Sequence, residues 1–509
     1  PPYLASLVIC QDRRGPGPQA DASYLSKLYA TLRPYGGVAC LPNRLRDRLA
    51  GWLEEAKPQG AELEKADQFV LLKRAGPLAG ADDWTHEAGG PGNTFASGDR
   101  RVKPPLRVLW FGGAFDRLGP GCRGVPRVCA GRMFVQFRND LLAVDIYTGR
   151  LLWRASGISA LGFVAVEDGI YVPSGGTCLR LDPATGSKLG QIDVPAAPES
   201  DQAAKRPWGA FRISGKHFVG ATGKQFRFPG PFEFDFAAPA GVELICLDRH
   251  SGKKLWSFQP ERDGVSFALG AGRAFCVDYW LPARRRRGEP DSEQATVYAL
   301  DLASGKVQWR ASVTVPAATK KDSPFGQYQP MTPWLSYCDD SDVLVLTANW
   351  SSLAAWRGRD GRRLWSKPIP CADPPSRYSV PQPPILLPQR LITHGGQMYD
   401  TVTGELLPDR LWRGINVGTR GCNRALACPQ IVVLRDADIS YFDLARGGRQ
   451  TRLRGIRSGC TNGLLPAGGV LNAPNLAYHC SCNWPIFTSM ALVHMPQASS
   501  RPPALQTER

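Results

Sequence analysis

The sequence predicts a mainly β protein: a β-propeller of eight blades, with seven as the alternative, preceded by a small α/β region. Three observations lead to this prediction. The 509 residues include 54 Gly and 44 Pro, a content that favours many turns over a helical bundle. A short turn motif recurs along most of the chain, whereas the first 75 residues alternate strand-like and helix-like patterns. No apolar run is long enough for a transmembrane helix, so we expect no membrane span.

Residues 1–75 are expected to form the α/β region, because short apolar runs alternate with segments whose apolar residues recur at helical spacing. The expected elements are strands at Leu4–Cys10 and Val38–Leu41, helices at Ser23–Leu32 and Asn43–Glu55, and a hairpin of Ala61–Lys65 and Phe69–Arg74. A strand follows almost directly after Pro1, so the sequence is expected to start inside a domain, with any export signal upstream.

Residues 76–105 are predicted to be a linker, because Gly, Pro and Asn recur through them and favour loop over helix. The linker contains the segment Trp84-Thr85-His86. Two interpretations of His86 stay open: the segment docks structurally on the following domain, or His86 is a catalytic residue.

The recurring turn motif is Asp-x-x-[Thr/Ser]-Gly. Five copies match it in full: Asp145 to Gly149, Asp182 to Gly186, Asp248 to Gly252, Asp301 to Gly305, and Asp400 to Gly404. Degenerate copies lie at Arg357–Gly361 and Asp443–Gly447. The Asp carboxylate can accept backbone N–H bonds of a turn, and the Gly supplies the positive φ that closes a tight connection between strands.

A Trp stands four residues after the motif glycine in several copies, namely Trp153, Trp256, Trp309 and Trp365. We expect these indoles to be buried between neighbouring sheets. Units of about 40 residues that cannot bury their own faces are typical of a propeller, here over residues 106–496. Leu106–Phe111 is expected to complete the last blade and so remove the edge strands. Residues 497–509 are expected to be a disordered tail.

The run Ala143-Val-Asp145-Ile-Tyr-Thr148-Gly149-Arg-Leu-Leu-Trp153 resembles the repeat of the pyrroloquinoline quinone (PQQ) propeller family, Ala-x-Asp-x-x-Thr-Gly-x-x-x-Trp, in full. Ala299–Trp309 resembles it with Ser304 in place of Thr. The resemblance implies a PQQ-like, quinoprotein-like propeller. PQQ repeats also occur in proteins without the quinone, so the resemblance leaves the activity open.

The stretch Leu32-Arg-Pro-Tyr-Gly-Gly-Val38 resembles the Leu-x-Pro-Gly-Gly segment of class I S-adenosylmethionine (SAM)-dependent methyltransferases, with Tyr35 inserted. Residues 1–75 would then be the C-terminal half of such a Rossmann-like domain, without its cofactor loop. The whole arrangement, with Gly459–Asn475, Cys480–Asn483 and Thr488–Val493 near its end, resembles planctomycete-type multidomain proteins. That resemblance implies a periplasmic or otherwise extracytoplasmic protein.

Five cysteines lie near the end of the chain: Cys422, Cys428, Cys460, Cys480 and Cys482. Disulfides, buried free thiols and a metal site that includes His479 are the three interpretations. Because Cys460 and the Cys480/Cys482 pair flank the proposed last blade, we predict a disulfide between Cys460 and either Cys480 or Cys482.

No nucleophilic, metal or phosphate-binding motif is present, so the main functional hypothesis is a monomeric binding or scaffold propeller with a protein or glycan partner. The net charge of +17 comes from scattered basic residues without interleaved aromatics, so we do not expect a nucleic-acid partner. One alternative is a PQQ- and Ca²⁺-dependent oxidoreductase, for which Asp278 beside Tyr279 and Trp280 in a funnel is a candidate; the competing interpretation is that these residues form a loop near the fourth blade. Another is an accessory propeller of a methyltransferase. No cofactor is assigned.

Overall fold

The structure is a computed structural model of the whole chain. It describes residues 2–10, 21–113, 122–159, 162–193, 195, 208–222, 227–228, 236–237, 240–262, 264–280, 292–316, 333–348, 352–368, 383–393, 395–412, 424–436, 438–453, 456–457, 463–474 and 486–496. The expected tail at 497–509 and the predicted disulfide cysteines Cys460, Cys480 and Cys482 lie outside these residues. No helix of the described part of the chain is long and apolar enough to cross a bilayer.

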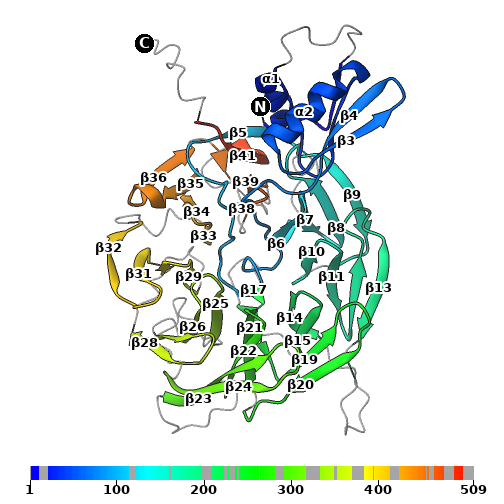
Figure 1. Cartoon of the computed structure of the whole chain (residues 1–509). Helices are drawn as coiled ribbons and strands as arrows, with labels where there is room; N and C mark the ends of the chain where they lie inside the picture. The colour runs from blue at the N-terminus through cyan, green and yellow to red at the C-terminus, as the bar shows by residue number, and fades with distance from the viewer. Residues whose placement is uncertain are drawn as a thin grey trace.

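Residues 2–10 and 21–76 form an N-terminal module with one sheet and two helices (Figure 1). Its elements are β1 (Leu7–Ile9), α1 (Ala22–Thr31), β2 (Gly37–Pro42), α2 (Arg46–Ala56), β3 (Ala61–Ala66) and β4 (Phe69–Arg74). The sheet order is β1-β2-β4-β3, and only β1 and β2 run parallel. Asp21 caps α1 by accepting the Tyr24 N–H at 2.8 Å. The helices bury Leu25, Tyr29, Leu49 and Trp52 in the core of the module.

Antiparallel four-stranded sheets form a ring, and the module lies at its upper right in Figure 1. The first two are β6 (Cys122–Cys129), β7 (Arg132–Phe137), β8 (Asp140–Asp145) and β9 (Leu151–Ser156), then β10 (Val164–Val166), β11 (Gly169–Ser174), β12 (Thr177–Leu181) and β13 (Lys188–Asp193). The third holds β14 (Trp208–Ser214), β15 (His217–Thr222), β19 (Glu243–Asp248) and β20 (Lys254–Phe258). The fourth holds β21 (Gly264–Gly270), β22 (Arg273–Tyr279), β23 (Ser292–Asp301) and β24 (Val307–Pro316), with β18 (Ala240–Gly241) added beside β21.

In the next three sheets the neighbouring strands again follow one another in chain order. The fifth sheet holds β25 (Trp334–Cys338), β26 (Val343–Ala348), β27 (Ser352–Arg357) and β28 (Arg363–Pro368), and the sixth holds β29 (Ile385–Leu386), β30 (Arg390–Ile392), β31 (Gln397–Asp400) and β32 (Leu406–Arg410). The seventh holds β33 (Leu426–Ala427), β34 (Ile431–Asp436), β35 (Asp438–Asp443) and β36 (Arg449–Leu453). Two-residue pairs lie beside these sheets: β16 (Arg227–Phe228) with β17 (Phe236–Ala237), and β37 (Ile456–Arg457) with β40 (Ile486–Phe487).

The last sheet joins the two ends of the ring. It holds β38 (Leu465–Ala467), β39 (Val470–Ala473), β41 (Met490–His494) and, as its outer strand, β5 (Leu106–Phe111). The register pairs Leu106 with His494 and Phe111 with Met490. The pairing of Leu106–Phe111 with the last unit, expected from the sequence, is therefore present, and Figure 1 shows both strands side by side.

Each motif turn connects the third and fourth strands of a sheet and uses its aspartate as a turn acceptor. Asp301 Oδ1 accepts the Ser304 N–H at 2.8 Å, and Asp400 Oδ1 accepts the Thr403 N–H at 2.7 Å. Asp145 makes the same contacts with Tyr147 and Thr148, but it is buried because Arg33 of the N-terminal module pairs with it. The motif thus defines the turn, and the first copy also joins the module to the ring.

The repeat tryptophans lie on the fourth strands and reach the turn of the next sheet. Each indole Nε1 donates to the carbonyl of the residue after the motif's first position; the pairs are Trp153 with Pro183, Trp256 with Leu302, Trp309 with Gly358 and Trp365 with Thr401, at 2.7–3.1 Å. Trp256 and Trp365 are buried, whereas Trp153 and Trp309 are half-buried. Trp110 of β5 makes the same bond to Ile146 at 2.8 Å, so the closing sheet contacts its neighbour in the same way.

Candidate functional site

The segment between residues 82 and 99 passes through the centre of the ring and contacts the innermost strand of each sheet in chain order (Figure 1). We call residues 82–99 the axial segment. Its bonds run from Trp84 to Val128, Thr85 to Ala165, His86 to Ile213, Pro91 to Leu269, Gly92 to Tyr337, Thr94 to Leu386, Phe95 to Ala427 and Ser97 to Pro466. These are bonds that the inner strands cannot make within their own sheets, so the segment satisfies buried backbone groups.

His86 is fully buried in this segment. Its Nε2 accepts the Ile213 N–H at 3.0 Å, and burial lowers its pKa well below 6.5, so the ring stays neutral. Its Nδ1 lies 2.7 Å from the Thr85 hydroxyl. Of the two interpretations of His86, this geometry supports the structural one, because both ring nitrogens are engaged within the fold.

The two ends of the axial segment meet at the closing sheet. Asp99 is buried and accepts N–H bonds from Gly469 at 2.7 Å and Arg101 at 2.8 Å. The Gly468 N–H donates to the Asp82 carbonyl at 2.8 Å, and Asp82 Oδ2 accepts the Gly98 N–H at 2.6 Å. The segment therefore forms a nearly closed loop inside the ring.

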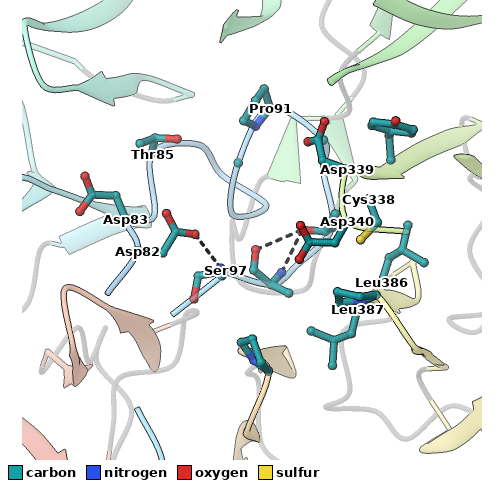
Figure 2. Close-up of a pocket in the computed structure, with 18 residues that line it drawn as sticks. Asp82, Asp83, Thr85, Pro91, Ser97, Cys338, Asp339, Asp340, Leu386 and Leu387 are labelled. Carbon is teal, nitrogen blue, oxygen red and sulfur yellow. Dashed lines mark hydrogen bonds between the residues drawn. The ribbon is translucent and has the colours of Figure 1, made fainter. Parts of the chain in front are cut away.

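An axial pocket of about 320 Å³ opens where this loop faces the turn between β25 and β26. It is lined by Asp82, Asp83, Thr85, Gly90, Pro91, Gly92, Thr94, Ala96, Ser97, Gly98, Tyr337, Cys338, Asp339, Asp340, Leu386, Leu387, Pro388 and Pro429. Figure 2 shows Asp82 and Asp83 on one side and Asp339 and Asp340 on the other, with Leu386 and Leu387 beside them. The lining combines four carboxyl groups with an apolar wall.

The carboxyl groups of the pocket sit in unequal surroundings. Burial raises the pKa of Asp83 to about 6, although the Cys129 thiol and the Ala130 N–H donate to its carboxylate. Burial and then the neighbouring charge of Asp340 raise the pKa of Asp339, whose Oδ1 accepts the Ala271 N–H at 2.7 Å. No basic side chain belongs to the described lining, so the pocket is negative in a chain whose net charge is +17.

The chemistry available in the pocket is cation binding rather than nucleophilic attack. Burial raises the pKa of the Cys338 thiol, which keeps it protonated and unreactive at neutral pH. Carboxylates beside proline and leucine side chains suit a lysine or arginine with its apolar stem. Within the described residues, no group of three or more His, Cys, Asp or Glu side chains has the arrangement of a metal site.

The residues considered for an oxidoreductase are placed differently from what the sequence suggests. Asp278 lies in strand β22, so its assignment to a loop is wrong. Its buried carboxylate accepts the Arg262 N–H at 2.9 Å and pairs with the Arg262 guanidinium at 3.2 Å. Tyr279 is buried in the same strand, whereas Trp280 is 46% exposed. Asp278 therefore anchors the segment that leads into β21.

The cysteine predictions are only partly within the described residues. Cys428 is a buried free thiol whose Sγ donates to the Val102 carbonyl at 3.3 Å. The pairing of Cys460 with Cys480 or Cys482 stays a prediction.

Sequence reasoning did not identify the axial pocket. The signal was present as two Asp-Asp pairs, Asp82-Asp83 and Asp339-Asp340, in a strongly basic chain. The two pairs are far apart in the sequence and come together only when the ring folds, so no sequence spacing relates them.

Comparison with known proteins gives one family match, over residues 236–405, to the PQQ-repeat family described as Outer membrane protein assembly factor BamB. No curated protein matches the chain. The structure of BamB from Moraxella catarrhalis is 13% identical with a TM-score of 0.43, and the match covers 77% of this chain and 98% of that one. Quinohemoprotein alcohol dehydrogenase from Comamonas testosteroni is 14% identical with a TM-score of 0.49, over 81% of this chain and 80% of that one.

The family match lies on the sheets that carry the motif turns. It includes the turns at Asp248, Asp301 and Asp400 and the tryptophans Trp256 and Trp309. The match therefore assigns PQQ-like repeats to residues 236–405, and the ring of four-stranded sheets around them is consistent with a β-propeller.

Proposed function

We propose that this protein is an extracytoplasmic binding module, and that its axial pocket holds a basic segment of a protein partner. The observation that carries the proposal is the convergence of Asp82, Asp83, Asp339 and Asp340 on one pocket without a basic residue in its described lining. The match to a family named for outer membrane protein assembly supports a scaffold role and an extracytoplasmic location.

The physical basis is relief of repulsion among the carboxylates. Asp339 and Asp340 are neighbours, and the charge of Asp340 already raises the pKa of Asp339. A lysine or arginine between the pairs would remove this repulsion and make charge-assisted hydrogen bonds, while Leu386, Leu387 and Pro388 cover its stem.

The test is binding of a short fluorescent Lys- and Arg-rich peptide, followed by anisotropy, to the wild type and to Asp340→Asn. Asp340 is exposed and its side chain makes no hydrogen bond within the described residues, so its substitution leaves the fold intact. We expect the affinity to fall about tenfold, the size of one charge-assisted contact. Asp409→Asn on the outer strand β32 is the matched control and should bind like the wild type.

The pH dependence gives a second readout of the same site. Asp83 has a pKa of about 6, so it gains its negative charge as the pH rises through that value. Peptide binding should therefore strengthen between about pH 5 and pH 7. Equal affinities of the wild type and Asp340→Asn, or equal binding of an acidic peptide of the same length, would contradict the proposal.

We further propose that the propeller has eight blades. The support is the set of eight sheets with four or more strands in the described part of the ring, together with the β5–β41 pairing.

We also propose that the N-terminal module is the C-terminal half of a methyltransferase-like domain. The order β1, α1, β2, α2, β3, β4 and the parallel pairing of β1 with β2 support this relationship.

A further inference from the structure

Two carboxyl groups of the axial pocket bind turns of the ring in the same way. Asp83 Oδ2 accepts the Ala130 N–H at 3.3 Å, and Asp339 Oδ1 accepts the Ala271 N–H at 2.7 Å. Figure 2 shows the two aspartates on opposite sides of the pocket. Ala130 lies in the turn between β6 and β7, and Ala271 lies in the turn between β21 and β22. Each side of the pocket is therefore fixed to one such turn.

The two turns are alike in sequence and in conformation. Ala130 and Gly131 have φ angles of +49° and +75°, and Ala271 and Gly272 have φ angles of +45° and +68°. An arginine follows each glycine, and its Nη1 donates to the carbonyl of the turn alanine; the arginines are Arg132 and Arg273. The turns are therefore a matched pair within one chain.

The turns differ in what lies against them. A Cβ built on Gly131 would lie 2.7 Å from the Tyr35 ring, whereas a Cβ built on Gly272 has no described atom within 4 Å. Tyr35 belongs to the N-terminal module and packs against the hydrophobic cluster that contains Cys129 and Ala130. The module therefore covers the turn that binds Asp83, whereas the other turn is open at the matching glycine.

The surroundings of Asp83 within the ring disfavour its charge. Burial raises the pKa of Asp83 to about 6. Hydrogen bonds from the Cys129 thiol and the Ala130 N–H oppose this shift, whereas the charges of Asp82 and Asp99 add to it. Asp83 therefore changes its charge at mildly acidic pH.

Tyr35 is the titratable group that faces this turn from the module. Burial, and then the charge of Asp83, raise the pKa of the Tyr35 phenol, so the phenol stays protonated. Glu167 and Arg132 act on both Tyr35 and Cys129, with opposite signs. The contact between the module and the turn thus lies within the electrostatic reach of Asp83.

We propose that the N-terminal module sets, through Tyr35, the pH range in which the axial pocket reaches its full negative charge. The proposal rests on the binding function proposed above. The docked Tyr35 ring excludes water from the turn to which Asp83 bonds, and exclusion of water disfavours an ionised carboxylate. When this contact is lost, water reaches the turn and Asp83 ionises at a lower pH. The pocket then holds a cation under more acidic conditions.

The coupling between docking and charge works in both directions. Docking favours protonated Asp83, so docking is strongest at acidic pH and weakens as the pH rises through about 6. A cation in the pocket favours ionised Asp83. Below about pH 6, a bound basic segment therefore loosens the contact of Tyr35 with the turn, by the same factor by which docking weakens its binding.

The first test compares binding of the fluorescent Lys- and Arg-rich peptide to the wild type and to Tyr35→Ala between about pH 5 and pH 8. We expect equal affinities at pH 8 and severalfold tighter binding by Tyr35→Ala at pH 5, because its midpoint lies lower by roughly half a pH unit to one unit. A gain of binding does not follow from a loss of stability. Tyr35→Phe keeps the ring and should follow the wild type.

The matched turns supply a second pair of variants. Gly131→Ala and Gly272→Ala both place a side chain at a positive φ, but only the first displaces the Tyr35 ring. Gly131→Ala should therefore shift the midpoint in the same direction as Tyr35→Ala. Gly272→Ala carries the same backbone strain and should leave the midpoint unchanged.

Infrared titration follows the proton on Asp83 without any peptide. The band of protonated carboxyl groups is recorded as the difference between each protein and its Asp83→Asn counterpart. This difference should titrate near pH 6 in the wild type and at a lower pH in Tyr35→Ala. Equal midpoints in the two proteins would overturn the proposal, and so would weaker peptide binding by Tyr35→Ala at every pH.

The two readouts separate this proposal from the binding function on which it rests. Equal peptide affinities of the wild type and Asp340→Asn would contradict the binding function. A lower infrared midpoint in Tyr35→Ala would still support control of the pocket charge by the module in that case.

Discussion

The contact between a repeat tryptophan and the next motif glycine joins neighbouring sheets at the level of single residues. A Cβ built on Gly305 would lie 2.6 Å from the Trp256 ring, and the same holds for Gly361 against Trp309. Several repeats lack this tryptophan, and the second sheet is one of them. Gly190 stands where the second sheet would carry its tryptophan, and Gly252, the glycine that it would reach, has no atom within 4 Å of a built Cβ. Gly252 is therefore a reference glycine within the same chain, at which no indole contacts the turn.

Substituting alanine at Gly305 and at Gly252 separates packing from backbone strain. The φ angles are +71° and +72°, so both substitutions carry the same left-handed strain of about 1–2 kcal/mol. Only Gly305→Ala also collides with an indole, which should cost roughly a further 1–3 kcal/mol. Urea unfolding of both variants measures the difference in the free energy of unfolding. Equal destabilisation would show that the indole contact does not limit the turn.

Two residues that lie together before β2 contribute to the docking of the N-terminal module on the ring, alongside the contact of Tyr3 with Tyr147. Arg33 Nη1 pairs with Asp145 Oδ2 at 2.8 Å, and the Tyr35 ring lies 2.7 Å from a Cβ built on Gly131 in the turn between β6 and β7. Tyr35 adopts a φ of +56°, which is uncommon for an aromatic residue. In the methyltransferase relationship proposed above, Tyr35 is the inserted residue, so that insertion would be the part of the segment that contacts the propeller.

Tyr35→Ala should loosen the docking of the module without unfolding the ring. Loss of a half-buried tyrosine contact should cost about 2 kcal/mol, and backbone amides in the facing turns, such as Ile146 bonded to the Gly131 carbonyl, should exchange faster. Hydrogen exchange followed by mass spectrometry measures this change. Tyr24→Ala, which removes an exposed tyrosine of α1, is the control and should leave these amides protected. Unchanged exchange in Tyr35→Ala would assign the docking to other contacts.

The elements of the ring could be predicted because each is encoded locally. The motif residues from Asp301 to Gly305 define a turn, and the apolar runs beside them define its strands, so the repeat is visible in the sequence. The axial segment could not be predicted in the same way. Asn93, for example, bonds to Phe267, Leu335 and Arg212, and no spacing in the sequence relates these residues. The pocket was missed for the same reason.

The axial segment makes the whole propeller depend on a short stretch of chain. Sheets that contact only their neighbours in the ring also share bonds to residues 82–99, and the closing sheet holds both ends of that stretch through Asp82 and Asp99. A change at one point of the segment should therefore reach sheets that it does not touch. Gly92 lies tightly against an inner strand, because a Cβ there would lie 2.3 Å from the Tyr337 carbonyl oxygen.

Gly92→Ala tests this dependence. The backbone of Gly92 does not need a positive φ, so the substitution acts through space alone and should lower the free energy of unfolding by about 1–3 kcal/mol. Gly90→Ala is the control two residues away, where a built Cβ has no atom within 4 Å, and it should be close to neutral. Because the Gly92 carbonyl bonds to β25 and its neighbours in the chain bond to β21, β29 and β33, hydrogen exchange should quicken on all four strands. Faster exchange confined to β25 would mean that the sheets unfold independently and that the axial segment only fills the centre of the ring.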